Sequence, residues 1–153
     1  MLMSARLKNL FLVIILSVFF AKNTKAQEFA DVSYYLIDSL NVDALDESDR
    51  YMLDSLLAIY HSSEEDSAKV GILNKITNNV MNDKVWPRYN DLSMRQAFSR
   101  MFSKSLSKDQ QKYYAGIYAS GVGNVGYYED QRGNTPLALE YYFASLDVKN
   151  TMV

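Results

Sequence analysis

The chain has 153 residues, a net charge of −2 at pH 7, no cysteine and a single histidine. Without cysteine the fold contains neither disulfides nor thiolate sites, and one histidine leaves too few groups for most metal or Ser-His-Asp chemistry. We therefore predict no catalytic residues, no metal and no cofactor.

The first 26 residues have the order of a secretory signal peptide. Arg6 and Lys8 precede an apolar run at 10–21, and the small residue Ala26 follows. The run holds about 12 residues, whereas a bilayer-spanning helix needs about 20. We expect an exported protein, periplasmic or on the cell surface. In the alternative, an uncleaved segment anchors the protein in the inner membrane, and only then does it contact a membrane.

Cleavage after Ala26 makes the remaining chain more acidic. The removed part contains four basic residues and no acid, so the product has a net charge of about −6. An acidic product of this kind argues against a nucleic-acid partner, because binding of nucleic acid needs a basic surface that displaces counterions.

Apolar residues at helical spacing dominate the rest of the chain, and strand-like alternation with hairpin turns is absent. We predict an all-α fold of antiparallel helix pairs. The expected helices span 29–40, 48–61, 66–81, 84–102, 108–132 and 135–148.

Glycine and proline mark several helix ends. Pro87 suits a first turn, and Gly133 suits the residue just past a helix. Thr135 is a capping residue before Pro136. Four glycines fall inside the expected helix 108–132, at a cost of about 1 kcal/mol each relative to alanine, which predicts close approach of a neighbouring helix there.

The segment 123–148, GNVGYYEDQRGNTPLALEYYFASLDV, resembles a tetratricopeptide repeat (TPR), a pair of antiparallel helices in about 34 residues. The best repeat covers about 119–150. The residues that carry the resemblance, and that it implies pack the pair, are Gly126, Gly133, Ala138, Tyr142, Ser145 and Leu146. The chain departs from the pattern near Val122, at Glu129 and at Asn150, where the family usually has Trp, Tyr and Pro.

A weaker copy of the repeat is expected at 66–102, and the wider resemblance is to the exported sensor regions of bacterial TPR-containing sensor histidine kinases. The implied organisation is a signal peptide at 1–26, a helical lead-in at 27–64 and a TPR-like α-solenoid at 65–153. Because stacked repeats normally need about three units, we interpret the chain as part of a longer regulator. The alternative is a small complete protein that covers or pairs its last helix.

Three sequence features suggest chemistry but have simpler explanations. His61 ends the expected helix 48–61, where a charged side chain favours the dipole, and the acids at 64–66 suit the start of the next helix. The GxGxxG spacing at 121–126 matches a nucleotide loop, but no strand precedes it, so we interpret these glycines as helix-packing positions.

The function that these features favour is a scaffold that binds a protein or peptide. Tyr127, Tyr128 and Tyr141 are the candidate partner-binding residues, because tyrosine offers a rigid apolar body with a polar tip. Two alternatives are a structural fragment that self-associates through its last helix and, ranked last, a small hydrolase.

Overall fold

The structure, a computed structural model, describes residues 34–38 and 40–152. Throughout these residues the regular secondary structure is helical, which confirms the predicted all-α fold. The chain divides between Leu40 and Asn41 into two units, each described here by itself. Among the helices of the described residues, none combines the length and apolarity that crossing a membrane requires. The predicted signal peptide at 1–26 lies outside the described residues.

The described part of the first unit is a short helical turn. Tyr34 and Tyr35 are helical, and their rings meet edge to face with centroids 5.2 Å apart. Leu36 then has a φ of 60°, in the left-handed region. A right-handed helix needs negative φ, so the predicted helix does not continue to Leu40. Its first residues, 29–33, lie outside the described part.

The second unit begins with the 3₁₀ turn η1 (Val42–Ala44), which lies between two of the expected helices, and continues into α2 (Glu47–Ser62). Asp46 caps α2, because its Oδ1 accepts a hydrogen bond from the backbone N–H of Asp49 at 2.8 Å. The helix ends before the acidic tract at 64–66, close to the predicted boundary.

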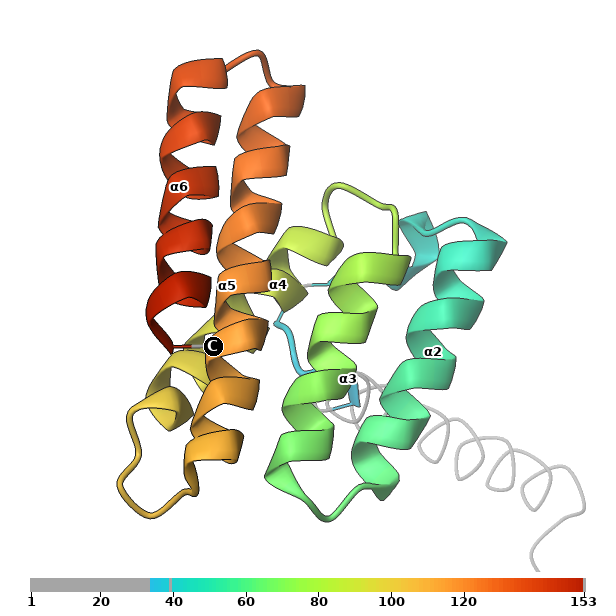
Figure 1. The fold of residues 1–153 in the computed structure, drawn as a ribbon. Coiled ribbons are helices and arrows are strands. Elements are labelled where there is room, and N and C mark those ends of the chain that lie inside the picture. The colour runs from blue at the N-terminus through green and yellow to red at the C-terminus, as the bar shows by residue number, and fades with distance from the viewer. Residues whose placement is uncertain (1–33, 39, 153) are drawn as a thin grey trace, which may run out of the picture. The chain divides into compact units, whose positions relative to one another are not determined.

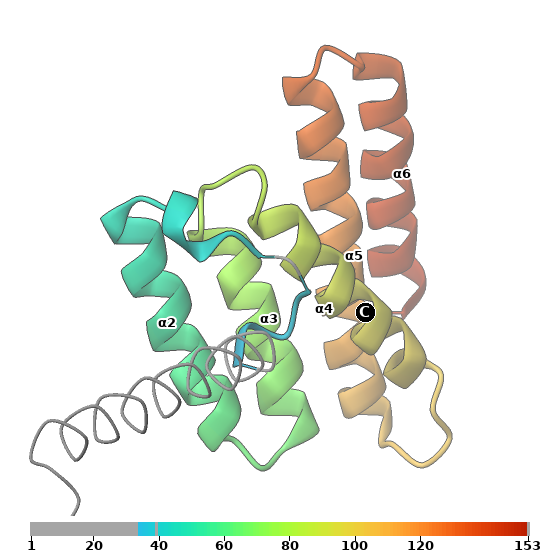
Figure 2. The same cartoon turned by 180° about the vertical axis from the view of Figure 1, so that it is seen from behind.

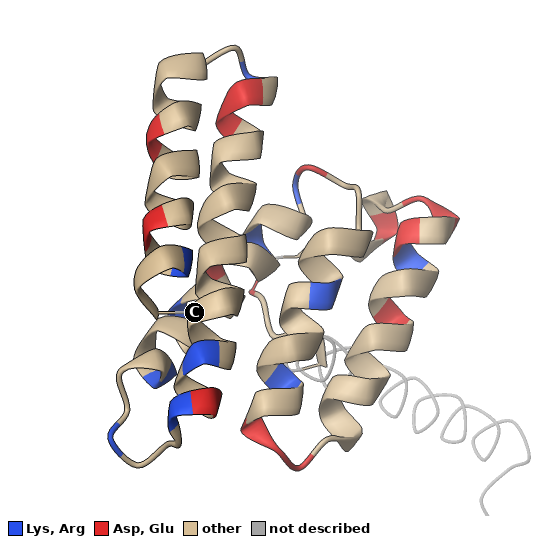
Figure 3. Ribbon diagram, viewed as in Figure 1, with Lys and Arg blue, Asp and Glu red and all other residues tan. Residues whose placement is uncertain are grey.

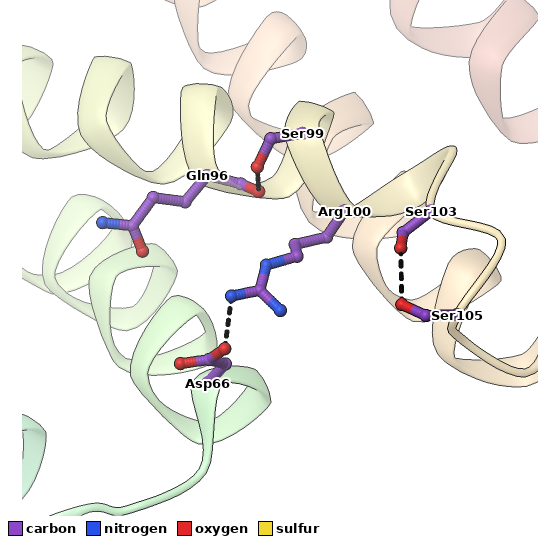
Figure 4. A network of polar contacts seen from close by, with 6 residues as sticks. All are labelled: Asp66, Gln96, Ser99, Arg100, Ser103 and Ser105. Carbon is purple, nitrogen blue, oxygen red and sulfur yellow. Dashed lines mark hydrogen bonds and ion pairs between the residues drawn. The ribbon is translucent and has the colours of Figure 1, made fainter.

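α3 (Asp66–Asn79) and α4 (Trp86–Met101) form the next two helices. Arg100, in the last turn of α4, pairs with Asp66, in the first turn of α3 (Figure 4). Each charge lies at the helix end whose dipole it offsets. Both side chains are about half exposed, so this ion pair contributes little to the stability of the fold. We interpret it as a contact that positions the two helix ends relative to each other.

α5 (Lys108–Gln131) and α6 (Thr135–Met152) form a long hairpin. α5 starts with a capping box, in which the backbone N–H of Gln110 donates to the Ser107 hydroxyl and the Ser107 N–H donates to the Gln110 side chain. Gly133 has a φ of 78° in the turn to α6, a conformation that glycine adopts without strain.

Consecutive helices from α2 to α6 run antiparallel, and each packs against the next (Figure 1). The α5–α6 hairpin extends past the ends of α3 and α4, as the view from behind also shows (Figure 2). α3 and α5 run in the same direction and contact each other directly. α2, expected to be part of a separate lead-in, packs against α3 within the same unit.

The core follows the apolar faces of these helices. A cluster of buried residues joins α3, α4 and α5, and Val148 and Met152 at the end of α6 pack against it. The largest side chains that are fully or almost fully buried are Tyr89, Leu53, Leu57, Leu73, Ile76 and Val80. The one buried polar side-chain atom without a partner in the described residues is the Ser93 hydroxyl oxygen.

Asp49 connects α2 to the segment after α3. It is buried, and its Oδ1 accepts a hydrogen bond from the backbone N–H of Met81 at 2.9 Å, 32 residues away. We expect Asp49→Ala to lower the free energy of unfolding by about 1–3 kcal/mol, because the donor loses its acceptor. Urea unfolding of the full-length chain at pH 7 measures this.

The matched control is Asp43→Ala. Asp43 is exposed and pairs with Arg50 at 3.2 Å, so its loss should cost less than about 1 kcal/mol. Equal losses in the two variants would contradict a structural role for Asp49.

Candidate binding surface between α3 and α5

Two hydrogen bonds hold α3 and α5 side by side. The Tyr113 hydroxyl donates to the backbone carbonyl of Ser67 at 3.3 Å, and the Asn124 amide donates to Asn78 Oδ1 at 3.3 Å. Both bonds join residues 46 positions apart, which fits two parallel helices in one constant register. The surface between the two helices, called here the α3–α5 surface, carries two pockets.

The first pocket has a volume of about 220 Å³ and lies near the end of α3. Its apolar side includes Trp86 of α4 and Tyr127 of α5, and Asn78 and Asn124 supply amide groups. The complete lining is Thr77, Asn78, Val80, Met81, Trp86, Asn124 and Tyr127. No residue in this lining is charged, so the pocket offers hydrogen bonds and apolar contact without a net charge.

Behind this pocket, three asparagines form a relay that fixes the direction of each amide. The buried Asn90 donates through Nδ2 to the carbonyl of Gly121 at 3.0 Å, so Asn90 Oδ1 is left to accept. Asn124 Nδ2 donates to that oxygen at 3.3 Å and to Asn78 Oδ1 at 3.3 Å. A carbonyl oxygen only accepts, so reversing any one of these amides would place two like groups against each other.

The second pocket, of about 410 Å³, lies near the start of α5. It is lined by Asn74, Asp109, Lys112, Tyr113, Gly116 and Ile117. Gly116 leaves space there, because an added Cβ would meet nothing within 4 Å. Partial burial raises the pKa of Tyr113 above its usual value of 10, so its hydroxyl keeps its proton and its bond to Ser67 at neutral pH.

Charged side chains are absent from most of α5. Between Lys112 and Glu129 the helix carries no Asp, Glu, Lys or Arg, and the charges of the hairpin lie toward its ends and on α6 (Figure 3). The α5 side of the middle of the α3–α5 surface is therefore neutral, with asparagine and tyrosine as its polar groups, whereas α3 carries Lys69 and Lys75.

The three tyrosines predicted for partner binding occupy different places. Tyr127 is 54% exposed and lines the smaller pocket. Tyr128 packs edge to face on Trp86, with ring centroids 5.6 Å apart, and Arg132 lies 5.5 Å from its ring centroid. Tyr141 is half-buried on α6 and does not line either pocket.

Several residues expected to pack the α5–α6 pair lie at its crossing. Gly126 is buried, and an added Cβ would come within 3.0 Å of the Ala138 carbonyl oxygen and 2.9 Å of the Tyr142 ring. The Ser145 hydroxyl donates to the carbonyl of Ala119 at 2.7 Å. The pair of small residues Gly126 and Ala138 thus lets the helices approach closely.

Tyr142 and Leu146, also expected to pack the pair, are only partly buried. They are 39% and 51% exposed, although Tyr142 follows the buried Ala138 by one helical turn on the same face of α6. The Tyr142 ring covers Gly126 with one edge and leaves the rest exposed.

The other features considered for chemistry lie apart from the α3–α5 surface. His61 is exposed in the last turn of α2, beside the Tyr60 ring. The glycines at 121–126 are helical throughout, with no loop for a nucleotide. Within the described residues, no three His, Cys, Asp or Glu side chains come together as a metal site.

The sequence-based prediction missed the asparagines. Asn78, Asn90 and Asn124 are not among the candidate residues of that prediction, and neither is Trp86. Polar residues at otherwise apolar positions were the available signal, because a buried amide needs hydrogen-bond partners from other helices. Comparison with protein-family models, curated proteins and solved structures gave no match for this chain.

Proposed function

We propose that the chain is a non-enzymatic helical-repeat scaffold that binds a segment of another polypeptide along the α3–α5 surface. The observation that carries this proposal is that both pockets are lined mainly by α3 and α5, two parallel helices of successive hairpins. Surfaces of this kind in stacked helical hairpins bind extended partners.

The α5–α6 hairpin supports kinship with TPR proteins through its small residues at the crossing. The offset of 46 residues between facing positions of α3 and α5 exceeds the TPR period of about 34 and lies in the range of other helical repeats. The proposal therefore concerns a helical-repeat scaffold, of TPR type in its last hairpin. Export and a place in the sensor region of a signalling protein remain part of this proposal and rest on the sequence alone.

A peptide-capture experiment tests the binding role. An unbiased library of 12-residue peptides is selected on the full-length chain, and bound peptides are crosslinked through a photoreactive phenylalanine placed at position 127 or, as control, at Tyr51. Both native tyrosines are exposed, and Tyr51 lies on α2 outside both pockets. We expect crosslinking at 127 only. No selected peptide, or equal crosslinking at the two positions, would contradict the proposal.

One observation favours self-association as a second candidate. Four apolar residues at helical spacing form an exposed stripe on α6: Leu139, Tyr142, Phe143 and Leu146. A helix that is apolar on two faces is usually covered on both. If copies of the chain pair here, sedimentation of the full-length protein should show a dimer that Phe143→Lys converts to a monomer. A wild-type monomer at high concentration would exclude this candidate.

A further inference from the structure

The smaller pocket presents a free hydrogen-bond donor beside a free acceptor. In the asparagine relay, Asn124 uses its Nδ2 toward Asn90 and Asn78, and Asn78 uses its Oδ1 toward Asn124. Within the described residues, Asn78 Nδ2 and Asn124 Oδ1 have no further protein partner. The relay thus fixes Asn78 as a donor and Asn124 as an acceptor for a ligand.

This arrangement matches one residue of an extended peptide. In a strand, the N–H and C=O of a residue point to the same side, and strand neighbours exchange both bonds with it. A ligand residue in this conformation can donate its N–H to Asn124 Oδ1 and accept at its C=O from Asn78 Nδ2. A carboxylate fits less well, because Asn124 Oδ1 would face an oxygen that carries negative charge.

The remaining walls select an uncharged side chain. Tyr127 and Met81 are exposed and offer apolar surface beside the buried Trp86, and no charged residue lines the pocket. Burying an unpaired ligand charge against such a wall is costly. The larger pocket differs, since Asp109 and Lys112 line it.

We infer that the pocket formed by Asn78, Asn124, Trp86 and Tyr127 is a peptide subsite that recognises the main-chain N–H and C=O of one extended residue with an uncharged side chain. This inference rests on the proposed function and specifies the partner as a neutral, extended peptide segment. It excludes an acidic chain terminus and a basic segment.

Trp86 is the single tryptophan of the chain and lines the pocket, so its fluorescence reports occupancy. The probe is a mixture of N-acetylated, C-amidated pentapeptides without tryptophan or charged residues, titrated into the full-length protein. We expect a saturable fluorescence change. Matched mixtures with Asp or Lys at the central position should bind at least about tenfold more weakly, because binding would bury a charge. A mixture N-methylated at the central residue should also bind at least about tenfold more weakly, because it loses one hydrogen bond to the pocket.

Substitutions separate recognition from folding. Asn78 is exposed, so Asn78→Ala should leave the helical circular dichroism signal of the protein unchanged. The same substitution should weaken binding of the neutral peptide mixture about tenfold. Asn79→Ala is the matched control, because Asn79 donates to the Lys75 carbonyl and lies outside the pocket lining. Asn79→Ala should bind as the wild type does.

The failure of this inference differs from the failure of the binding proposal. If library peptides crosslink at position 127 but bind Asn78→Ala and wild type equally, the scaffold role stands and the subsite is overturned. Equal binding of the neutral, Asp and Lys mixtures, or no saturable change up to about 1 mM peptide, also overturns the subsite. If no peptide is captured anywhere on the chain, the binding proposal itself fails.

Discussion

Replacing Gly126 with alanine is expected to destabilise the protein by about 1–3 kcal/mol, although alanine favours helices. The added Cβ would come within 3.0 Å of the Ala138 carbonyl oxygen, a backbone atom that moves only if α6 moves. It would also come within 2.9 Å of the Tyr142 ring. The clash should therefore outweigh the gain in helix propensity, which urea unfolding of the full-length chain measures.

Gly116 is the matched control in the same helix. An added Cβ there meets nothing within 4 Å, so Gly116→Ala should stabilise by about 0.5–1 kcal/mol through the lower entropy of the unfolded chain. The two substitutions are chemically identical, and we expect effects of opposite sign. A stabilising effect at Gly126 as large as that at Gly116 would show that α5 and α6 do not cross closely there.

The second large effect is expected in the centre of the helical stack. Leu73 on α3 is fully buried, and truncation to alanine removes apolar contact and leaves a cavity. Substitutions of this kind cost about 2–5 kcal/mol, depending on how far the surroundings collapse.

The control for this substitution is Ile59→Ala on α2. Ile59 is 53% exposed, so its truncation removes little buried surface and should cost less than about 1 kcal/mol. Thermal or urea unfolding of both variants makes the comparison. A small loss at Leu73 would mean that α3 is not enclosed by its neighbours.

Helix ends set by local chemistry were predictable from the sequence. Ser107 and Gln110 form a capping box, and Gly133 adopts the positive φ that ends α5, so the bounds of α5 differ from the prediction by one residue at most. α6 starts at Thr135 as expected, but Thr135 is its first helical residue rather than its cap, and the Thr135 hydroxyl donates to Asp130 Oδ1 at 3.4 Å.

Ends set by packing were less predictable. α6 was expected to finish near Val148 but continues to Met152, because both side chains pack against the cluster between α3, α4 and α5. The helix expected at 29–40 does not reach its predicted end, since Leu36 has positive φ, and no residue there carries a local signal for such a bend.

The candidate surface was predictable only in kind. The chemistry of tyrosine predicts a binding surface but not its position, and of the three candidate tyrosines only Tyr127 lines one of the two pockets of the α3–α5 surface. The asparagine relay depends on the register of α3 against α5, which places Asn78 beside Asn124 at a separation of 46 residues. No local pattern encodes that register, because it results from how α4 packs against both α3 and α5.

The measurement that tests the central claim most directly is a crystal structure of the full-length chain covalently held at position 127 to a captured peptide. If a peptide binds on the α3–α5 surface, we expect continuous electron density for an extended segment along both helices. Its main chain should form hydrogen bonds with Asn78 and Asn124. Peptide density on the outer stripe of α6, or on α2, would contradict it.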